Sequence, residues 1–353
     1  MRVLHVITGL GLGGAEQQLR LLLRNLPEEC EVVTLANPGP VADAIRADGT
    51  PVHVLLMRGN RDLAVLPRLV KLMRAGRFDV VHTHLYRACV YGRLAARLAG
   101  IRHVVATEHS LNDGVIEGRA TTRGVRVLYK ASERLGTSTI AVSDAVSRRL
   151  KDWGVDRVRV IPNGIDAAEF AFDASLRAAT RSRLGIAPGA RVVGAVGRLD
   201  PTKCFDRLVR AIASLPDLTL LLVGDGPARA SLEALVASLG LSERVIFAGG
   251  TPDVRELLCA MDVLASPSDR ETFGLAILEA LACGLPVRYA SCPPLEELSP
   301  DFAPAALRVD DFVSALRDID YTQRQPVPPA VAHYDISRLA GAVRELYQGK
   351  VQK

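Results

Sequence analysis

Short apolar runs alternate along the chain with longer stretches in which apolar residues recur every three to four positions. The short runs predict buried β-strands and the longer stretches predict amphipathic helices. Strands are expected in two series, 2–7, 31–36, 52–56, 79–83, 103–107 and 138–142, then 191–196, 218–223, 244–247, 262–266, 286–290 and 306–309. Helices are expected at 14–25, 63–75, 88–99, 122–135, 143–151, 205–215, 228–239, 253–260, 274–283, 311–318 and 335–348.

This alternation is typical of parallel sheets that carry helices on both faces. Two series of six strands predict an α/β protein with two doubly wound domains rather than one large sheet. Proline and Asn-Gly in segment 160–164 indicate a turn between them. The last helix follows no strand, so we expect it to cross back onto the first domain. The predicted domains are residues 1–166 with 335–353, and residues 167–334.

The composition is that of a globular protein. The 353 residues are 48% hydrophobic and 24% charged, and no run of 18 apolar residues indicates a membrane span. The first residues lack the plan of a signal peptide and instead predict a strand. The six cysteines include no Cys-x2-Cys pair, which favours a reduced, cytoplasmic protein.

Charge is divided unevenly between the two predicted domains. Residues 1–166 hold 24 Lys and Arg against 16 Asp and Glu, a balance of +8, whereas residues 167–353 hold 20 against 23. The basic half is suited to an anionic acceptor or an anionic membrane surface, although a solvated basic surface explains it equally well. Two stretches place cations at helical spacing: Arg119, Arg123, Arg126, Lys130 and Arg134, and also Arg68, Lys71, Arg74 and Arg77. Solvated helix faces usually have this pattern, and interfacial binding is the alternative.

A glycine-rich segment, Gly9-Leu-Gly11-Leu-Gly13-Gly14-Ala-Glu16, follows the first strand and opens a helix. It satisfies the Gly-x-Gly-x-x-Gly pattern of dinucleotide-binding domains. The second strand, however, runs into Asn37 without the acidic residue that would hold a ribose. We therefore expect a loop that lets a phosphate or substrate approach the backbone closely, rather than a dinucleotide site.

Two cations and two carboxylates follow strands of the second series. Arg198 and Lys203 come after strand 191–196, while Glu271 precedes and Glu279 lies one turn into a helix that begins near Gly274. A guanidinium fork, an ammonium and the unpaired N–H groups of a helix start suit a diphosphate. The carboxylates can accept hydrogen bonds from sugar and ribose hydroxyls. Since the carboxyl ends of parallel strands form one crevice, these residues predict a nucleotide-sugar site rather than a solvated surface.

Two other features are weaker. Gly226 belongs to the turn Gly224-Asp-Gly-Pro227 after strand 218–223, where it can make a secondary contact with a nucleoside. His82, His84 and His109 end two strands of the first domain. Three histidines can indicate zinc, but His-x-His on a strand supplies no fixed fourth ligand. We expect no metal, and we expect His109 to hydrogen-bond a sugar hydroxyl.

Over nearly its whole length the chain resembles retaining glycosyltransferases of the GT-B fold, specifically family 4 (GT4). The resemblance is carried by Gly11-Leu-Gly13-Gly14-Ala-Glu16, Glu108-His109, Ile161-Pro-Asn-Gly-Ile-Asp166, Gly197-Arg-Leu-Asp-Pro-Thr-Lys203, Val223-Gly-Asp-Gly-Pro227 and Glu271-x7-Glu279 with Ala282-Cys-Gly-Leu-Pro286. The order and spacing of these motifs make it specific. It implies two Rossmann-like domains facing a central cleft, with the acceptor held by the first and the nucleotide-sugar donor by the second. It also implies that neither a cofactor nor a divalent metal is needed.

The same resemblance implies residue roles. Arg198 and Lys203 would neutralise the leaving diphosphate, Glu271 would contact the transferred sugar and Glu279 the ribose. Backbone groups of Phe273, Gly274, Leu275 and Ala276 would assist at the diphosphate. Gly13 and Gly14 would close over the phosphates, and His109 would line the sugar site. Two positions depart from the family pattern: Cys204 replaces a glycine, which is tolerable if that residue is helical, and Cys292-Pro-Pro294 replaces a glycine-rich turn.

The expected function is transfer of a hexose from a nucleotide sugar, UDP-linked by preference, to an acceptor hydroxyl with retention of configuration. The acceptor would be a lipid-linked or anionic glycan of the cell envelope, or a small secondary metabolite. We expect a cytoplasmic enzyme, leave peripheral contact with the inner face of the membrane open, and expect no nucleic-acid partner. One alternative is a nucleotide-sugar epimerase of the same fold, although its additional cleft acids are not identifiable. A non-catalytic nucleotide-sugar-binding partner is the other, and the intact set of cations and carboxylates argues against it.

Overall fold

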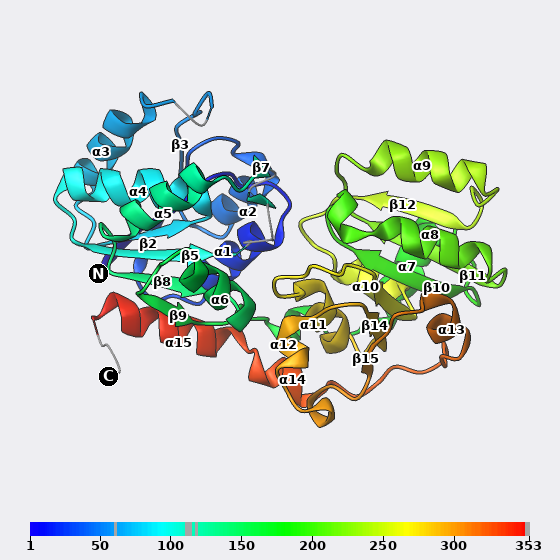
Figure 1. The fold of residues 1–353 in the computed structure, drawn as a ribbon. Helices are drawn as coiled ribbons and strands as arrows, with labels where there is room; N and C mark the ends of the chain where they lie inside the picture. The colour runs from blue at the N-terminus through cyan, green and yellow to red at the C-terminus, as the bar shows by residue number, and fades with distance from the viewer. Residues whose placement is uncertain (60–61, 110–114, 117–118, 350–353) are drawn as a thin grey trace. The chain divides into compact units, whose positions relative to one another are not determined.

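A computed structural model describes residues 1–59, 62–109, 115–116 and 119–349. The chain forms two compact units (Figure 1). The first comprises Met1–Gly164 with Ile336–Lys353, and the second comprises Ile165–Asp335. The division of the chain at Gly164 lies two residues before the predicted one. No helix among the described residues is long and apolar enough to cross a membrane.

The first unit contains a parallel sheet that has seven strands within the described residues, in the order β3-β2-β1-β4-β5-β8-β9. Its strands are β1 (Arg2–Ile7), β2 (Glu29–Thr34), β3 (Val52–Val54), β4 (Val80–His84), β5 (His103–Glu108), β8 (Ser138–Ala141) and β9 (Val158–Val160). A separate antiparallel pair is formed by β6 (Val115–Ile116) and β7 (Arg119–Ala120). The sequence did not predict β9, because this three-residue edge strand has no buried residue to mark it.

Helices cover both faces of this sheet. They are α1 (Gly14–Arg24), α2 (Gly39–Ala47), α3 (Val65–Gly76), α4 (Tyr86–Ala99), α5 (Arg123–Glu133), α6 (Asp144–Asp152) and α15 (Ile336–Tyr347). Alternate residues of β1 face opposite ways, so that Leu4 and Val6 pack with α3 and α4, while Val3 packs with α1 and α15. The C-terminal helix α15 therefore belongs to the first unit, as predicted.

The second unit has a parallel sheet of six described strands in the order β12-β11-β10-β13-β14-β15. Its strands are β10 (Arg191–Val196), β11 (Leu218–Val223), β12 (Val245–Gly249), β13 (Val263–Ser266), β14 (Val287–Tyr289) and β15 (Ala306–Arg308). Its α-helices are α7 (Ala174–Arg183), α8 (Phe205–Ala213), α9 (Arg229–Ser238), α10 (Arg255–Ala260), α11 (Leu275–Ala282), α12 (Pro293–Glu296), α13 (Phe312–Arg317) and α14 (Pro329–His333), and short 3-10 helices span Ala167–Phe170, Pro201–Lys203 and Pro300–Phe302. Separate apolar cores lie on its two faces, one against α8, α9 and α13 and the other against α7, α10, α11 and α14.

Both sheets reverse their strand order beside their first strand. In the first unit β1 lies between β2 and β4, and in the second unit β10 lies between β11 and β13. At such a switch point the loops that follow adjacent strands diverge to opposite faces and leave a crevice at the carboxyl edge. The predicted doubly wound architecture is thus confirmed, and it puts the loops after β1, β4, β10 and β13 where a ligand is expected.

Candidate functional site

The loops after β10 and β13 bring Lys203 and Glu271 together. Lys203 ends the short helix Pro201–Lys203, and Glu271 lies in the loop before α11. The Lys203 ammonium forms an ion pair with the Glu271 carboxylate, although 68 residues separate them in sequence. Both side chains are partly buried. Local sequence patterns placed each residue at the crevice but did not predict this pair.

Arg198 lies in the same loop as Lys203, and its carbonyl accepts a hydrogen bond from the Asp200 backbone at 2.8 Å, but its guanidinium makes no hydrogen bond or ion pair with the part of the chain that the structure describes. Its side chain is exposed. Burial tends to raise the pKa of the neighbouring Asp200 carboxyl, but hydrogen bonds from Thr202 and the charges of Arg198 and Lys203 outweigh it, so the pKa of Asp200 is lowered. Asp200 accepts hydrogen bonds from the Thr202 backbone N and hydroxyl, at 3.1 and 2.8 Å, and so caps the helix that positions Lys203.

Other contacts join these loops into one support. The Ser268 hydroxyl donates to the Thr202 carbonyl at 3.2 Å. Arg207 of α8 donates through both terminal nitrogens to Asp269, at 2.6 Å each. Bidentate contacts of this kind fix geometry as well as add energy. The two loops are therefore joined to each other independently of the Lys203–Glu271 pair.

The turn after β11, which contains Gly224 and Gly226, packs against the loop that carries Arg198. The backbone of Leu199 donates to Asp225 at 3.0 Å, and Ala228 donates to Leu199 at 2.8 Å. A Cβ on Gly224 would clash with the Gly197 carbonyl, and one on Gly226 would clash with the Leu199 carbonyl. Close packing against Leu199 therefore explains why position 226 is a glycine. The contact of Gly226 with the nucleoside stays a prediction.

The start of α11 presents backbone N–H groups at the crevice. Gly274 precedes the helix with φ +87°, and no side chain caps it. Phe273 is buried edge-to-face against Tyr334, with ring centroids 5.4 Å apart. The Cys292 thiol lies behind this segment, 3.5 Å from the Phe273 carbonyl oxygen. The first N–H groups of a helix, here at Leu275 and Ala276, have no intrahelical partner and suit an anion.

Glu279 lies in the middle of α11 and is half-buried. Burial raises the pKa of its carboxyl from 4.5 to about 7. Within the described residues no group donates a hydrogen bond to this carboxylate. A hydroxyl-bearing ligand would supply the missing donors and favour the ionised form.

Cys204 corrects one expectation. We expected this replacement of a glycine to be tolerated if the residue is helical. The structure instead places Cys204 in the left-handed region, with φ +54°, between the 3-10 helix and α8. A non-glycine residue pays a conformational cost of about 1 kcal/mol in this region. Cysteine is thus accommodated here with strain.

In the first unit, the glycine-rich loop ends at α1. Gly13 is the extended residue before the helix, with φ −129°, and Gly14 is its first residue. No side chain caps this helix start either. A Cβ at Gly13 would meet the carboxylate of Glu16. The loop therefore exposes backbone donors at its switch point, which fits the predicted approach of a phosphate.

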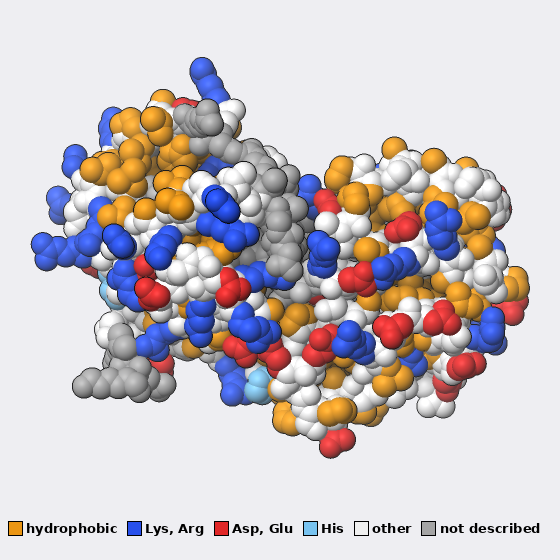
Figure 2. All heavy atoms as spheres, in the orientation of Figure 1, with side chains coloured by type: hydrophobic (Ala, Val, Ile, Leu, Met, Phe, Trp, Pro, Cys, Tyr) orange, Lys and Arg blue, Asp and Glu red, His pale blue; other side chains and the backbone are white. Residues whose placement is uncertain are grey.

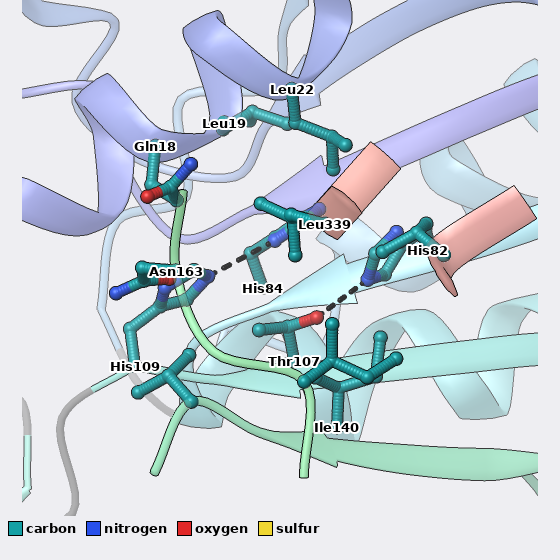
Figure 3. Close-up of a pocket in the computed structure, with 13 residues that line it drawn as sticks. Gln18, Leu19, Leu22, His82, His84, Thr107, His109, Ile140, Asn163 and Leu339 are labelled. Atoms are coloured by element: carbon teal, nitrogen blue, oxygen red, sulfur yellow. Dashed lines mark hydrogen bonds between the residues drawn. The ribbon is translucent and has the colours of Figure 1, made fainter. Parts of the chain in front are cut away.

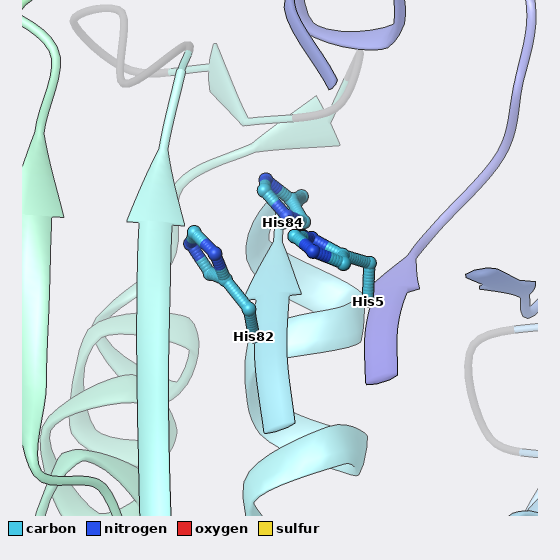
Figure 4. Close-up of side chains that lie close together, drawn as sticks. All are labelled: His5, His82 and His84. Atoms are coloured by element: carbon cyan, nitrogen blue, oxygen red, sulfur yellow. Dashed lines mark hydrogen bonds between the residues drawn. The ribbon is translucent and has the colours of Figure 1, made fainter. Parts of the chain in front are cut away.

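His109 follows β5 and belongs to a buried cluster of four histidines. Its Nε2 lies 3.3 Å from Nδ1 of His84 on β4, whose Nε2 lies 3.1 Å from Nδ1 of His5 on β1. The rings of His5, His82 and His84 face the same side of the sheet (Figure 4). Sequence analysis missed His5 because only the parallel pairing of β1 with β4 places it beside His82.

Nitrogen atoms of His5, His82 and His84 lie within 4.8 Å of one another, which is close enough to share a metal ion. Both ring nitrogens of His82 are already in short hydrogen bonds, at 2.6 Å with the Tyr347 hydroxyl and 2.7 Å with the Thr107 hydroxyl. A metal would have to displace one of them. Burial lowers the pKa of His5 to about 3 and that of His109 to about 4, so these rings are neutral. The cluster is therefore best described as a neutral hydrogen-bonded network.

The two doubly wound units and the loops at their switch points are those of a GT-B glycosyltransferase. Residues 12–169 match the family model described as Glycosyltransferase Family 4, and residues 177–303 match Glycosyl transferases group 1. A D-inositol 3-phosphate glycosyltransferase of Acidothermus cellulolyticus is 32% identical over 360 residues, covering 93% of this chain and 72% of that protein. The chain belongs to the family 4 glycosyltransferases.

Two further proteins extend the comparison. The UDP-Gal:alpha-D-GlcNAc-diphosphoundecaprenol alpha-1,3-galactosyltransferase of Escherichia coli is 32% identical over 258 residues, covering 69% of this chain and 66% of that enzyme. Across such relatives the matched stretch covers 52% to 72% of their length. The structure of Anabaena Alr3699/HepE in complex with UDP-glucose has the same fold, with a TM-score of 0.85 at 24% identity, covering 99% of this chain and 100% of that one. The named relatives are transferases, which favours transfer over the epimerase and the binding partner.

Proposed function

We propose that this protein transfers a hexose from a UDP-linked sugar to an acceptor hydroxyl, with retention of anomeric configuration and without a divalent metal. The observation that carries the proposal is the Lys203–Glu271 ion pair beside Arg198, at the switch point of the second sheet. The galactosyltransferase relative is named for a UDP-linked donor, and the HepE structure contains UDP-glucose. Both support UDP as the nucleotide.

The ion pair explains how the same residues serve the free and the donor-bound protein. Without donor, Glu271 holds Lys203 at the crevice and each neutralises the other. A bound diphosphate would compete for the ammonium, and Glu271 would then accept hydrogen bonds from hydroxyls of the transferred sugar. Glu279, whose carboxyl lacks a donor among the described residues, would take the ribose hydroxyls.

Bond cleavage would depend on charge that is already in place. Arg198, Lys203 and the N-terminus of α11 would stabilise the negative charge that develops on the leaving diphosphate. The sugar would pass through an oxocarbenium-like state, and the acceptor oxygen would attack from the face that the diphosphate leaves. A donor phosphate oxygen would accept the proton. In this proposal Arg198 and Lys203 would supply the positive charge at the leaving diphosphate without a divalent ion.

For the acceptor we propose a lipid-linked or anionic molecule that meets the first unit, with a small secondary metabolite as the alternative. Helices α3, α4 and α5 expose cations on one side of this unit, and α4 and α5 also expose large apolar side chains there (Figure 2). On α5, Val127 and Leu128 are 67% and 51% exposed beside Arg123 and Lys130. The side chain of Arg119 lies outside the described residues. Apolar groups rimmed by cations suit an anionic membrane surface.

The donor site is tested by measuring UDP release and product formation from UDP-glucose and UDP-galactose, with acceptor alcohols that include inositol 3-phosphate. Lys203→Ala should lower kcat/KM by about 10²-fold or more, since it removes charge from the transition state. Arg198→Ala should act in the same direction. Arg210→Ala, which removes an exposed cation of α8, serves as the matched control.

The anomeric configuration of the product and the effect of EDTA test the remaining parts of the proposal. Retention of the donor configuration and full activity in EDTA are expected. Wild-type kinetics in both loop variants would refute the assigned site. Conversion of the nucleotide sugar into its epimer without an acceptor would instead favour the epimerase.

A further inference from the structure

Three histidines of the first unit form a continuous line of hydrogen-bonded rings. Nδ1 of His5 contacts Nε2 of His84 at 3.1 Å, and Nδ1 of His84 contacts Nε2 of His109 at 3.3 Å. The two outer nitrogens of the line, Nε2 of His5 and Nδ1 of His109, are buried and have no hydrogen-bond partner among the described residues. The protonation of the three rings is therefore linked from one end to the other.

Neutral imidazole carries one N–H, so each ring can donate from one nitrogen only. Burial lowers the pKa of all three histidines, which keeps them neutral near pH 7. Only two arrangements preserve both N–H···N bonds: every ring protonated at Nδ1, or every ring protonated at Nε2. The state of His84 thus determines which nitrogen of His109 carries its proton.

The surroundings of the two ends favour protonation at Nδ1. Protonation at Nε2 would leave the His5 end as a buried N–H without an acceptor, which proteins rarely contain. Protonation at Nδ1 leaves only an unpaired acceptor at His5 and puts the unpaired N–H on His109. His109 lines a small cavity with space for about one water molecule and His5 does not, so room for an acceptor lies beside His109 alone of the two (Figure 3).

A second buried donor belongs to the same cavity. Gln18 of α1 is 3% exposed and also lines it, and its Nε2 has no partner in the described structure. Its Oε1 accepts a hydrogen bond from the backbone of Gly164 at 3.1 Å, which fixes the orientation of the amide. Gln18 and His109 thus bring two buried nitrogens without a hydrogen-bond partner to the lining of one cavity.

We propose that His84, supported by His5, is a positioning residue that holds His109 as an Nδ1–H donor, and that His109 and Gln18 together bind one neutral oxygen in this cavity. The oxygen is that of a water molecule in the free protein or of a substrate hydroxyl in the complex. The second alternative rests on the proposed function, whereas the tautomer of His109 does not.

Long-range ¹H–¹⁵N correlation spectra of histidine-labelled protein test the tautomer directly, with His109 assigned from its own substitution. His109 is expected to be protonated at Nδ1 in the free protein. His84→Leu should release it into a mixture of tautomers, and His84→Asn, whose amide can donate in place of Nδ1, should restore the Nδ1–H form. His103→Asn, on β5 but outside the line, is the control. Protonation of His109 at Nε2 in the wild type would overturn the inference, even in an active enzyme.

The rate of UDP release from UDP-glucose then tests whether the line of histidines affects the reaction. His84→Leu should lower kcat/KM by about tenfold and His84→Asn should recover most of it, which loss of packing alone would not produce. Gln18→Leu should also lower kcat/KM while leaving the His109 tautomer unchanged. If UDP-glucose shifts the Nδ1 proton resonance of His109, the oxygen is a substrate hydroxyl; if it does not, the oxygen is water. Unchanged kinetics in His84→Leu and Gln18→Leu would remove the positioning role.

Discussion

The candidate site in the loops after β10 and β13 depends on a few side chains whose surroundings set their charge. Lys203 and Glu271 form an ion pair, Asp200 is kept ionised by Thr202 and nearby cations, and burial raises the pKa of Glu279 to about 7. Residue type and position after a strand were sufficient to identify these residues as candidates. Which of them pair, and which is left without a donor, depends on contacts between loops that are far apart in sequence.

The raised pKa of Glu279 predicts a pH-dependent affinity for UDP-glucose. With a free-state pKa of about 7, only about a tenth of the carboxyl is ionised at pH 6. If the ribose hydroxyls bind the ionised form, the affinity should rise by up to about tenfold from pH 6 to pH 9, with proton release on binding. Calorimetric titrations in two buffers of different ionisation enthalpy measure both quantities.

The matched variants for this measurement are Glu279→Gln and Glu243→Gln. The first should weaken binding and abolish its rise with pH, and the second, at an exposed position of the same unit, should keep it. An affinity independent of pH in the wild type would contradict the role of Glu279. Without ligand the sign is opposite: because the folded pKa lies above the ordinary value of 4.5, the stabilising contribution of protonated Glu279 is lost as the pH rises through about 7.

Helix α7 shows why some elements could not be predicted from periodicity. Its sequence, Ala-Ser-Leu-Arg-Ala-Ala-Thr-Arg-Ser-Arg, contains one large apolar residue. Polar contacts hold it instead. Arg177 and Arg181 donate to the two oxygens of Asp262, at 2.5 and 2.9 Å, and the same carboxylate accepts from the Val192 backbone at 2.7 Å. A buried carboxylate thus joins α7 to β10 and to the start of β13.

Asp262→Ala should therefore destabilise the second unit severely. It leaves Arg181, which is almost fully buried, without its counter-charge, and the expected loss in unfolding free energy is about 3–5 kcal/mol. Urea denaturation followed by circular dichroism measures this loss. Asp217→Ala, at an exposed position before β11, should change stability by less than about 0.5 kcal/mol. A similarly small effect at Asp262 would show that α7 is held by its apolar contacts.

The two units differ in net charge. The basic excess of residues 1–166 was visible in the sequence. The structure adds that α3, α4 and α5 lie on the same side of the first sheet and that two of them expose apolar side chains among their cations. The helical spacing of the cations alone could not show whether this helix surface is simply solvated or binds a membrane, because the spacing does not reveal which apolar residues are exposed.

Binding to vesicles tests this face. The protein should sediment at low salt with vesicles that contain phosphatidylglycerol and not with pure phosphatidylcholine vesicles, and high salt should release it. Arg123→Glu with Lys130→Glu should weaken binding by at least about tenfold. Arg210→Glu with Arg317→Glu makes the same charge change at exposed positions of the second unit and should bind as the wild type does. Failure of the wild type to bind at low salt would remove the membrane proposal.

By itself, the sequence determined the features that depend on local order along the chain. Strand–helix alternation established the two doubly wound units, and the residues after each strand identified the loops at their switch points. The return of α15 also followed from local order, because this helix has no strand before it. Such inferences succeed because apolar periodicity and turn chemistry act over a few residues.

Only the tertiary structure decided the contacts between distant segments. His5 contacts His84 across 79 positions, Lys203 pairs with Glu271 across 68, and Cys204 has a left-handed conformation between the 3-10 helix and α8. The line of histidines and the cavity shared by Gln18 and His109 exist because strand pairing and helix packing bring these groups together in a space without bulk water. Burial then sets their protonation, and no local pattern of residues encodes burial.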